Sequence, residues 1–239
     1  MIRFATSSDA CIPALPQPAL LLEFARSCEL PEPALLRGSG LTASMLDSAG
    51  GMVTPAQYLQ LLENLLRQTG SSDTSFLLGQ QMLPGQSGAL SHALLNAPDL
   101  RHALDTLCKG HASLTPLLSP RWREADGMAI VYWNDSFGAP AMRAALVEMH
   151  MAALVSLCRW LSGERLSWRF CFNRAAPRHV EQHEVHLGSA LRFNCHLDAM
   201  LVDAAWLDKP WPRGSAVASA MALRQAEACL LYTSPSPRD

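Results

Sequence analysis

Apolar residues recur at helical spacing through most of the first half of the chain, and the pattern changes after about residue 120. Positions three, four and seven apart fall on one face of a helix, so each such run predicts a helix. We expect helices at 18–29, 32–37, 43–48, 55–68, 73–82, 88–96 and 99–113. Residues 1–17 are expected to form an irregular leader, because Pro13, Pro16 and Pro18 oppose regular structure.

Two turn signals separate the helices in the middle of the chain. Pro84 cannot continue a helix, and Gly85 takes the backbone angles that a turn needs. Pro98-Asp99 breaks the chain again, and Asp99 is suited to cap the helix that follows. The sequence therefore predicts a stack of short helices with little polar chemistry.

The second half has strand patterns around one long apolar helix. Asp126-Gly127 is a strong two-residue hairpin signal, flanked by the expected strands Trp122–Ala125 and Met128–Trp133. The elements expected after the hairpin are a helix at Pro140–Ser162, a strand at Leu166–Phe172, a helix at Pro177–Leu187, strands at Ala190–Cys195 and Met200–Asp203, and a helix at Ala216–Cys229. This order predicts an α+β fold in which a helical N-terminal half packs on an antiparallel sheet.

The composition excludes several classes of protein. Of the 239 residues, 49% are hydrophobic and 17% are charged, which is typical of a globular chain and not of a disordered one. No apolar run of about 20 residues and no signal peptide appears, so we expect a cytoplasmic protein without membrane contact. Seven cysteines without a Cys-x-x-Cys motif indicate neither a disulfide framework nor a zinc ribbon. A net charge of −2 without a basic stripe argues against nucleic-acid binding by this portion.

A series of motifs in fixed order resembles the N-terminal effector-binding domain of AraC-type bacterial transcription regulators. The motifs are Leu35-Leu36, Gly40-Leu41-Thr42, Met45-Leu46, the helix from Thr54 to Leu66, Pro84-Gly85 with Gly88-Ala89-Leu90, Asn96-Ala97-Pro98-Asp99-Leu100, Ala103-Leu104 and Leu191-Arg192-Phe193-Asn194. Each motif is made of common residues, and their order over residues 30–210 carries the resemblance.

The resemblance implies a domain organisation and a function. It places an effector-binding, dimerising domain at 18–210 and a linker helix at 211–229, followed in such regulators by a DNA-binding module that this chain lacks. Residues 230–239 resemble a non-native tail. We therefore expect a sensor, not an enzyme, with a small apolar or amphipathic effector, a homodimeric state and contact with DNA only through the missing module.

The order of elements is also similar to haem nitric-oxide-binding sensor domains, so a stand-alone small-molecule or haem-type sensor is the alternative. Cys108 lies where that family has its haem-ligating histidine. The signature that holds the haem propionates falls near Tyr132, where serine and arginine are absent from their places. We therefore expect no cofactor.

Aromatic residues on the strands and methionines on the long helix indicate an apolar pocket between sheet and helix. The residues that we expect to contact the effector are Cys108, His111, Tyr132, Met149, Trp168 and Arg169. Arg169 and Arg192 are candidate anchors for a carboxylate.

A third reading is a metal or thiol enzyme. Cys108 and His111 are three residues apart, a spacing that can activate a thiolate. His179, His183 and His186 would share one helical face, as metal ligands often do, but the charges around them favour a solvated face. We therefore expect no catalytic residue and no metal site.

Overall fold

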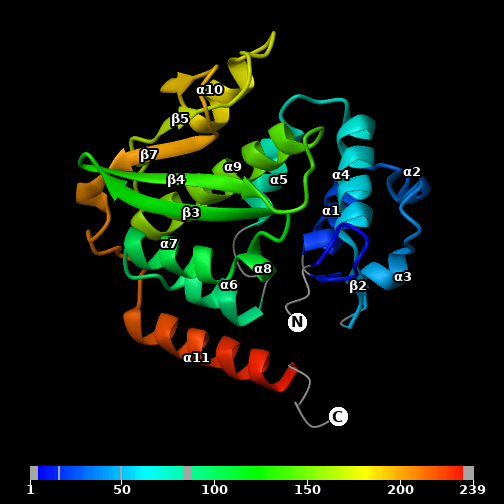
Figure 1. The fold of residues 1–239 in the computed structure, drawn as a ribbon, viewed down its shortest axis with the longest axis horizontal. Coiled ribbons are helices and arrows are strands. Elements are labelled where there is room, and N and C mark those ends of the chain that lie inside the picture. The colour runs from blue at the N-terminus through cyan, green and yellow to red at the C-terminus, as the bar shows by residue number, and fades with distance from the viewer. Residues whose placement is uncertain (1–4, 16, 49, 83–87, 234–239) are drawn as a thin grey trace.

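The computed structural model describes residues 5–15, 17–48, 50–82 and 88–233. Its first half is helical, as expected, and packs against one end and one face of a sheet (Figure 1). The helices are α1 (Gln17–Ser27), α2 (Glu32–Leu36), α3 (Ala43–Leu46), α4 (Pro55–Thr69), α5 (Thr74–Met82), α6 (Gly88–Leu95), α7 (Leu100–Lys109) and α8 (His111–Leu114). The helix expected at 99–113 is divided at Gly110 into α7 and α8. A Cβ atom added at Gly110 would lie against the side chains of Leu90 and Leu114.

Local sequence signals explain where several of these helices begin and end. Thr54 and Gln57 form a reciprocal capping box at the start of α4. Asp99 accepts a hydrogen bond from the backbone N–H of His102, as the sequence indicated. α5 ends at Met82 and α6 begins at Gly88; the turn predicted at Pro84-Gly85 lies outside the described residues.

The expectation of an irregular leader is wrong for residues 12–14. Strand β1 (Ile12–Pro13) pairs with strand β2 (Met52–Val53) in a two-stranded sheet. Ile12, Ala14 and Val53 are buried, so contacts with a distant part of the chain order this segment despite its prolines.

A five-stranded sheet forms the second half, in the order β3-β4-β7-β5-β6. The strands are β3 (Leu118–Ala125), β4 (Met128–Asp135), β5 (Arg169–Cys171), β6 (Leu191–Arg192) and β7 (Ala199–Asp203). The predicted β3–β4 hairpin is confirmed, and Asp126 and Gly127 both have positive φ, 51° and 71°. Such angles match the twist of a two-residue hairpin.

The sheet is not wholly antiparallel, which corrects the expectation. β6 pairs with β5 in parallel, while the other pairs are antiparallel. Helix α10 (Glu181–Leu187) lies between β5 and β6 in the chain. Parallel neighbours need a crossover connection of this kind, so the intervening helix sets the direction of β6.

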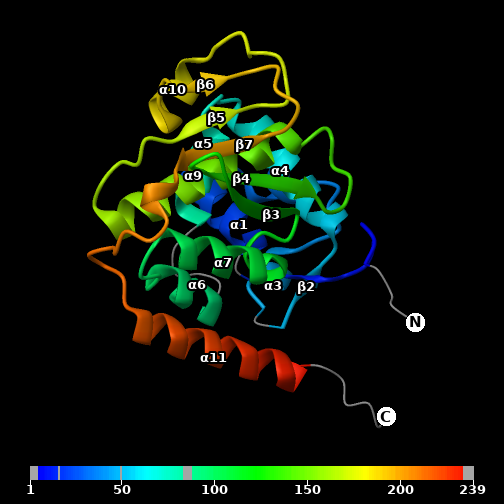
Figure 2. The ribbon, with the colours of Figure 1, turned by 60° about the vertical axis from the view of Figure 1, so that its left-hand side comes forward.

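Helix α9 (Arg143–Ser162) covers one face of the sheet and begins three residues later than expected (Figures 1 and 2). Val131, Met200 and Phe170 align across three strands and are buried on this inner face. Among the described helices, α9 alone is long and apolar enough to span a membrane, and 61% of its most apolar window is buried in the protein. Its apolar character is therefore accounted for by its place in the core.

The contact between α5 and α9 is a close approach of two backbones. Gly79 of α5 lies against the backbone of Met149, and a Cβ atom on Gly79 would come within 2.2 Å of the Met149 carbonyl oxygen. Glycine is required here because its missing side chain lets the helices touch.

The last helix, α11 (Ala216–Thr233), packs along α6 at the margin of the molecule (Figure 2). Ser219 Oγ donates a hydrogen bond to the carbonyl of Ala93, which joins the two helices. The helix extends four residues beyond the expected end at Cys229, into the segment expected to be a non-native tail; residues 234–239 lie outside the described residues.

A titratable group lies in the middle of α9. His150 is 5% exposed, and burial lowers its pKa to about 4, although a hydrogen bond between its Nδ1 and the Leu146 carbonyl, 2.6 Å long, acts in the opposite direction. An unfolded histidine has a pKa of about 6.5. Between about pH 6.5 and pH 4, the unfolded chain therefore binds a proton at this position that the folded protein does not.

This difference predicts that stability falls as the pH is lowered. The stabilisation is fully present above about pH 6.5, and the His150 contribution should fall by about 2 kcal/mol between pH 7 and pH 5. Urea unfolding at several pH values measures it. His150→Gln should reduce the pH dependence, whereas replacing the exposed His196 by Gln should leave it nearly unchanged; equal slopes for wild type and His150→Gln would contradict the assignment.

Candidate functional site

A hollow of about 330 Å³ opens on the outer face of the sheet, away from α9, at its β5–β6 edge. We call it the arginine pocket. Its lining residues come from β5, β6, β7 and the turn before β6: Arg169, Phe170, Cys171, Ser189, Ala190, Leu191, Arg192 and Leu201. Two of the eight are arginines, and apolar side chains make up most of the rest.

Strand geometry explains why the two arginines line the same hollow. Successive side chains of a strand point to opposite faces, so Arg169 and Cys171 point outward while Phe170 is buried. Arg169 aligns with Leu201 of β7, and Cys171 aligns with Arg192 of β6. Arg192 therefore comes to the same face as Arg169 only because β6 joins the sheet beside β5.

Neither guanidinium of the arginine pocket has an ion-pair or hydrogen-bond partner among the described side chains. By contrast, Arg143 pairs with Asp198 at 2.9 Å, and Arg174 pairs with Glu148 at 2.5 Å. The lining contains no acidic residue. Two unneutralised guanidiniums beside apolar walls form an environment suited to an organic anion, because guanidinium binds carboxylate through parallel hydrogen bonds.

A second hollow of about 300 Å³ lies on the other side of Arg169. Arg165 and Trp168 contribute to it, and Ser189 and Ala190 line both hollows. Trp168 is 5% exposed, and its indole nitrogen has no hydrogen-bond partner among the described atoms. Arg169 thus lines both hollows, whereas the Trp168 side chain is buried on the opposite face of the chain.

Cys108 and His111 form a separate group near the end of α7. Burial raises the pKa of the Cys108 thiol to about 11. Burial, and then the positive charge of Arg121, lower the pKa of His111, whose Nδ1 lies 3.3 Å from Ser119 Oγ. At neutral pH the thiol is protonated, so this group lacks the thiolate that nucleophilic catalysis requires.

Tyr132 and Met149 lie elsewhere again. Tyr132 is half-buried on the outer face of β4, in register with Arg121. Met149 is fully buried in α9, where its backbone meets Gly79. The six expected residues therefore do not form one site, and the apolar pocket expected between sheet and helix is filled core in which Trp133, Trp168 and Met151 are also buried.

A buried ionic cluster, not foreseen from the sequence, joins α5, α9 and α10. Glu148 accepts hydrogen bonds from Ser75 Oγ and from Arg174, each 2.5 Å long, and its carboxylate lies 3.1 Å from His183 Nε2. The rings of Phe76, Phe172 and Phe193 surround His183 with centroid distances of 5.0–5.6 Å. We call the segment from Arg169 to Arg192, which contains β5, α10 and β6, the β5–β6 lobe. The cluster fixes this lobe, and with it the arginine pocket, onto the helical half.

The expected helical face of three histidines needs correction. α10 begins at Glu181, so His179 lies outside it, and His183 is 5% exposed instead of solvated. Among the described residues, no three His, Cys, Asp or Glu side chains are grouped as metal ligands. The only sequence signal for the buried role of His183 was its place one turn before Leu187 on a charged helix, which is too weak to predict burial.

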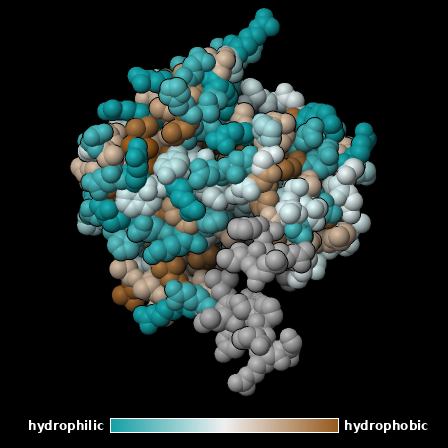
Figure 3. All heavy atoms as spheres, in the orientation of Figure 1, coloured by the Kyte–Doolittle hydropathy of each residue, from teal (hydrophilic) through white to brown (hydrophobic). Residues whose placement is uncertain are grey.

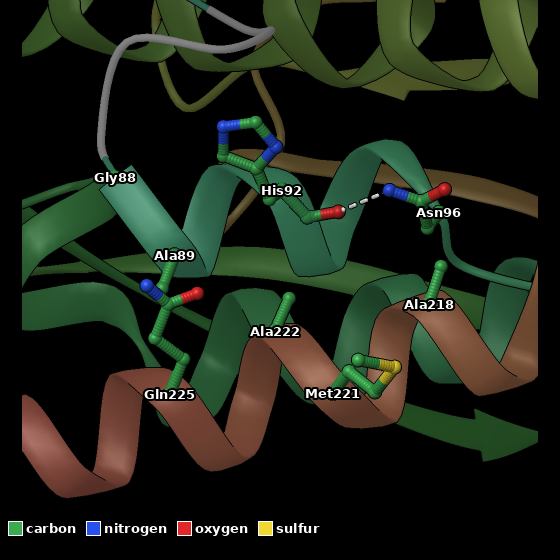
Figure 4. Close-up of a pocket in the computed structure, with 8 residues that line it drawn as sticks. All are labelled: Gly88, Ala89, His92, Asn96, Ala218, Met221, Ala222 and Gln225. Carbon is green, nitrogen blue, oxygen red and sulfur yellow. Dashed lines mark hydrogen bonds between the residues drawn. The ribbon is translucent and has the colours of Figure 1, made fainter.

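A further hollow, about 660 Å³ in volume, follows the seam between α6 and α11 (Figure 4). Ala218 and Ala222 point from α11 toward α6, and the His92 ring is turned away from α11. The seam has no charged lining residue. Small side chains that leave space between two helices do not by themselves indicate a ligand.

Exposed apolar residues lie near both the arginine pocket and helix α11 (Figure 3). Figure 3 shows a largely hydrophilic face with apolar residues appearing near β5 and β7 and at the start of α11. Val217 and Met221 of α11 are both well exposed. The apolar residues of the arginine pocket lie beside Arg169 and Arg192, which have no ion-pair partner among the described residues.

Comparison with known proteins agrees with this architecture. The chain is 24% identical over 211 residues to the ornithine utilization regulator of Pseudomonas aeruginosa, covering 88% of this chain and 62% of that protein. Its fold is similar to the crystal structure of the transcriptional regulator CdpR from Pseudomonas aeruginosa, with a TM-score of 0.64 and 13% identity, over 86% of this chain and 60% of that one. The chain thus spans about three fifths of the length of these relatives.

The family described as the N-terminal arabinose-binding domain of AraC transcription regulators matches residues 30–211. That match covers most of the chain and includes helices α2 to α8, the five-stranded sheet and the arginine pocket. The chain therefore belongs to the family of N-terminal ligand-binding domains of AraC-type transcription regulators.

Proposed function

We propose that the chain is the effector-sensing domain of a cytoplasmic AraC-type regulator and that its effector is an organic anion bound in the arginine pocket. The single observation that carries this proposal is the pair of guanidiniums, Arg169 and Arg192, which line one hollow without a neutralising partner among the described residues. The apolar walls formed by Leu191 and Leu201 suit an aliphatic or aromatic body attached to the anionic group.

The charge of the pocket also bears on what kind of effector fits. Ornithine, which appears in the name of one relative, has two ammonium groups and one carboxylate. The pocket lining provides no acidic side chain for an ammonium group. A monocarboxylate without a free amine matches the lining better, since unpaired like charges in a site are unfavourable.

Regulation requires that the effector bind one arrangement of the protein more tightly than another. Such binding would shift the arrangement of the β5–β6 lobe relative to the helical half. The pocket lies in the lobe, and the Glu148 cluster joins the lobe to the helical half. The shift would be passed to a homodimer and to a C-terminal DNA-binding module. The chain in this proposal acts by binding and not as an enzyme.

The test uses pentanoate as an anionic probe and pentanamide as its uncharged counterpart, titrated into the chain by calorimetry or NMR. We expect pentanoate to bind and pentanamide to bind at least about 10-fold more weakly, as for a charge-assisted hydrogen bond of about 1.5–3 kcal/mol. The Arg169→Gln and Arg192→Gln variants should each weaken pentanoate binding about 10-fold or more.

The matched control is Arg123→Gln, which removes an exposed arginine from β3 on the outer face of the same sheet, outside the pocket. It should bind pentanoate as the wild type does. Equal binding of pentanoate and pentanamide, an equal loss in all three variants, or resonance shifts confined to the α6–α11 seam would count against the proposal.

A further inference from the structure

Two cysteines lie on adjacent backbone segments at the edge of the arginine pocket, and the AraC-type resemblance assigns neither of them a role. Cys171 is the last residue of β5 and lines the pocket. Cys195 follows β6 by three residues, and its backbone N–H donates to the Phe172 carbonyl at 3.0 Å. The Arg192 carbonyl accepts from Phe172 N–H at 2.8 Å and from the Cys195 thiol at 3.6 Å. The Arg192 carbonyl thus holds Cys195 beside Phe172, the residue that follows Cys171.

Both cysteines of the pair are accessible to solvent, as Cys11 and Cys108 also are. Cys171 and Cys195 are both half-buried, whereas Cys158 is fully buried in α9. Burial, and next a hydrogen bond with the Cys195 thiol, raise the pKa of Cys171, while the charge of Arg192 acts in the opposite direction. The backbone hydrogen bonds between Phe172 and the segment from Arg192 to Cys195 bring the two cysteines together, and solvent reaches both thiols.

We infer that Cys171 and Cys195 are a modification site at which a peroxide oxidises the pair to a disulfide. The Cys195 thiolate attacks one peroxide oxygen, which breaks the O–O bond and gives a sulfenic acid and, after protonation, water. The sulfur of Cys171 then attacks the sulfenic sulfur, forms the S–S bond and expels a second water. The two thiols lose two protons and two electrons, and hydrogen peroxide is reduced to two molecules of water.

The disulfide has a direct structural consequence for the pocket. It ties the end of β5 to the segment after Arg192, which otherwise holds to β5 through a two-residue strand and the hydrogen bonds around Phe172. Oxidation would fix the wall that carries Arg192 and so regulate anion binding. This regulatory part rests on the proposed function, whereas the thiol chemistry does not.

The experiment treats the reduced chain with hydrogen peroxide and maps its tryptic peptides by mass spectrometry. Cleavage after Arg169, Arg174, Arg192 and Arg213 separates Cys171 from Cys195, so a disulfide links peptides 170–174 and 193–213. We expect this linked pair, with the loss of two hydrogen atoms and reversal by dithiothreitol. It should be absent from Cys171→Ser and Cys195→Ser and unchanged in Cys28→Ser, which removes an exposed thiol elsewhere.

Sulfinic or sulfonic acid at either cysteine without the linked peptide, or linkage mainly to other cysteines, would overturn the modification site. Because the wild-type map is decisive by itself, the inference stays testable even if a serine variant fails to fold. Pentanoate titration of the oxidised and reduced chains then tests the regulatory part, and equal affinities would overturn it. Absence of pentanoate binding by the reduced chain contradicts the proposed function instead and leaves the peptide result intact.

Discussion

Replacing Glu148 by alanine is expected to lower the free energy of unfolding by about 3–5 kcal/mol, the cost of leaving buried charges without their partner. Glu148 is the only acidic group in a cluster with Arg174 and His183, whose side chains are 22% and 6% exposed. Its removal also leaves the Ser75 hydroxyl without its acceptor. Urea unfolding followed by circular dichroism measures the effect.

Glu164→Ala is the matched control, because Glu164 also pairs with a cation, Lys209, but both side chains are about half exposed. Surface pairs of this kind contribute about 0–1 kcal/mol. Glu148→Gln, which keeps the shape and removes the charge, should fall between wild type and Glu148→Ala. The free energies of unfolding of Glu148→Ala and Glu164→Ala should differ by more than about 1 kcal/mol, which is the upper limit for a surface pair. A smaller difference would mean that the cluster does not hold the lobe to the helices.

Gly79→Ala is expected to destabilise the protein by about 3 kcal/mol, the upper part of the range for overpacking a filled core. The added methyl group would lie 2.2 Å from the Met149 carbonyl oxygen, and its other near neighbours are also backbone atoms of Met149. A backbone cannot turn aside as a side chain can, so α5 and α9 must move apart. Alanine stabilises a helix by about 1 kcal/mol relative to glycine. The expected destabilisation by Gly79→Ala already includes this gain.

The control for this substitution is Gly50→Ala, since nothing lies within 4 Å of a Cβ atom at Gly50. It should change the melting temperature and the urea midpoint little. The pair of variants separates steric conflict from the general effect of adding a methyl group to the chain. A Gly79→Ala variant as stable as Gly50→Ala would mean that the two helices are not in backbone contact.

Features encoded by neighbouring residues were predictable from the sequence. The periodicity of apolar residues located the helices, and Asp126-Gly127 specified the hairpin because both residues accept positive φ. Alternation in 166–172 also placed Arg169 opposite Trp168 and Phe170. Each of these signals operates over a few residues, within one element.

Features set by pairing between distant segments were not predictable. Alternation gave the face of Arg169, but Arg192 joins it only because β6 pairs with β5 in parallel. Ser75 and Glu148 meet across 73 positions, and His183 is buried by rings from three separate segments of the chain. A charged helix read alone gives no sign of such burial, since the neighbours that exclude water come from elsewhere in the chain.

The strand order of the large sheet also bears on how the protein avoids self-association. Its edges are β3 and β6, and unpaired edges are templates for adding strands from other molecules. β6 is only two residues long. β3 is longer, but Pro120 removes a donor from its edge, and Arg121 and Arg123 place charges along it. The two edges of the sheet therefore present few free backbone groups to strands of another molecule.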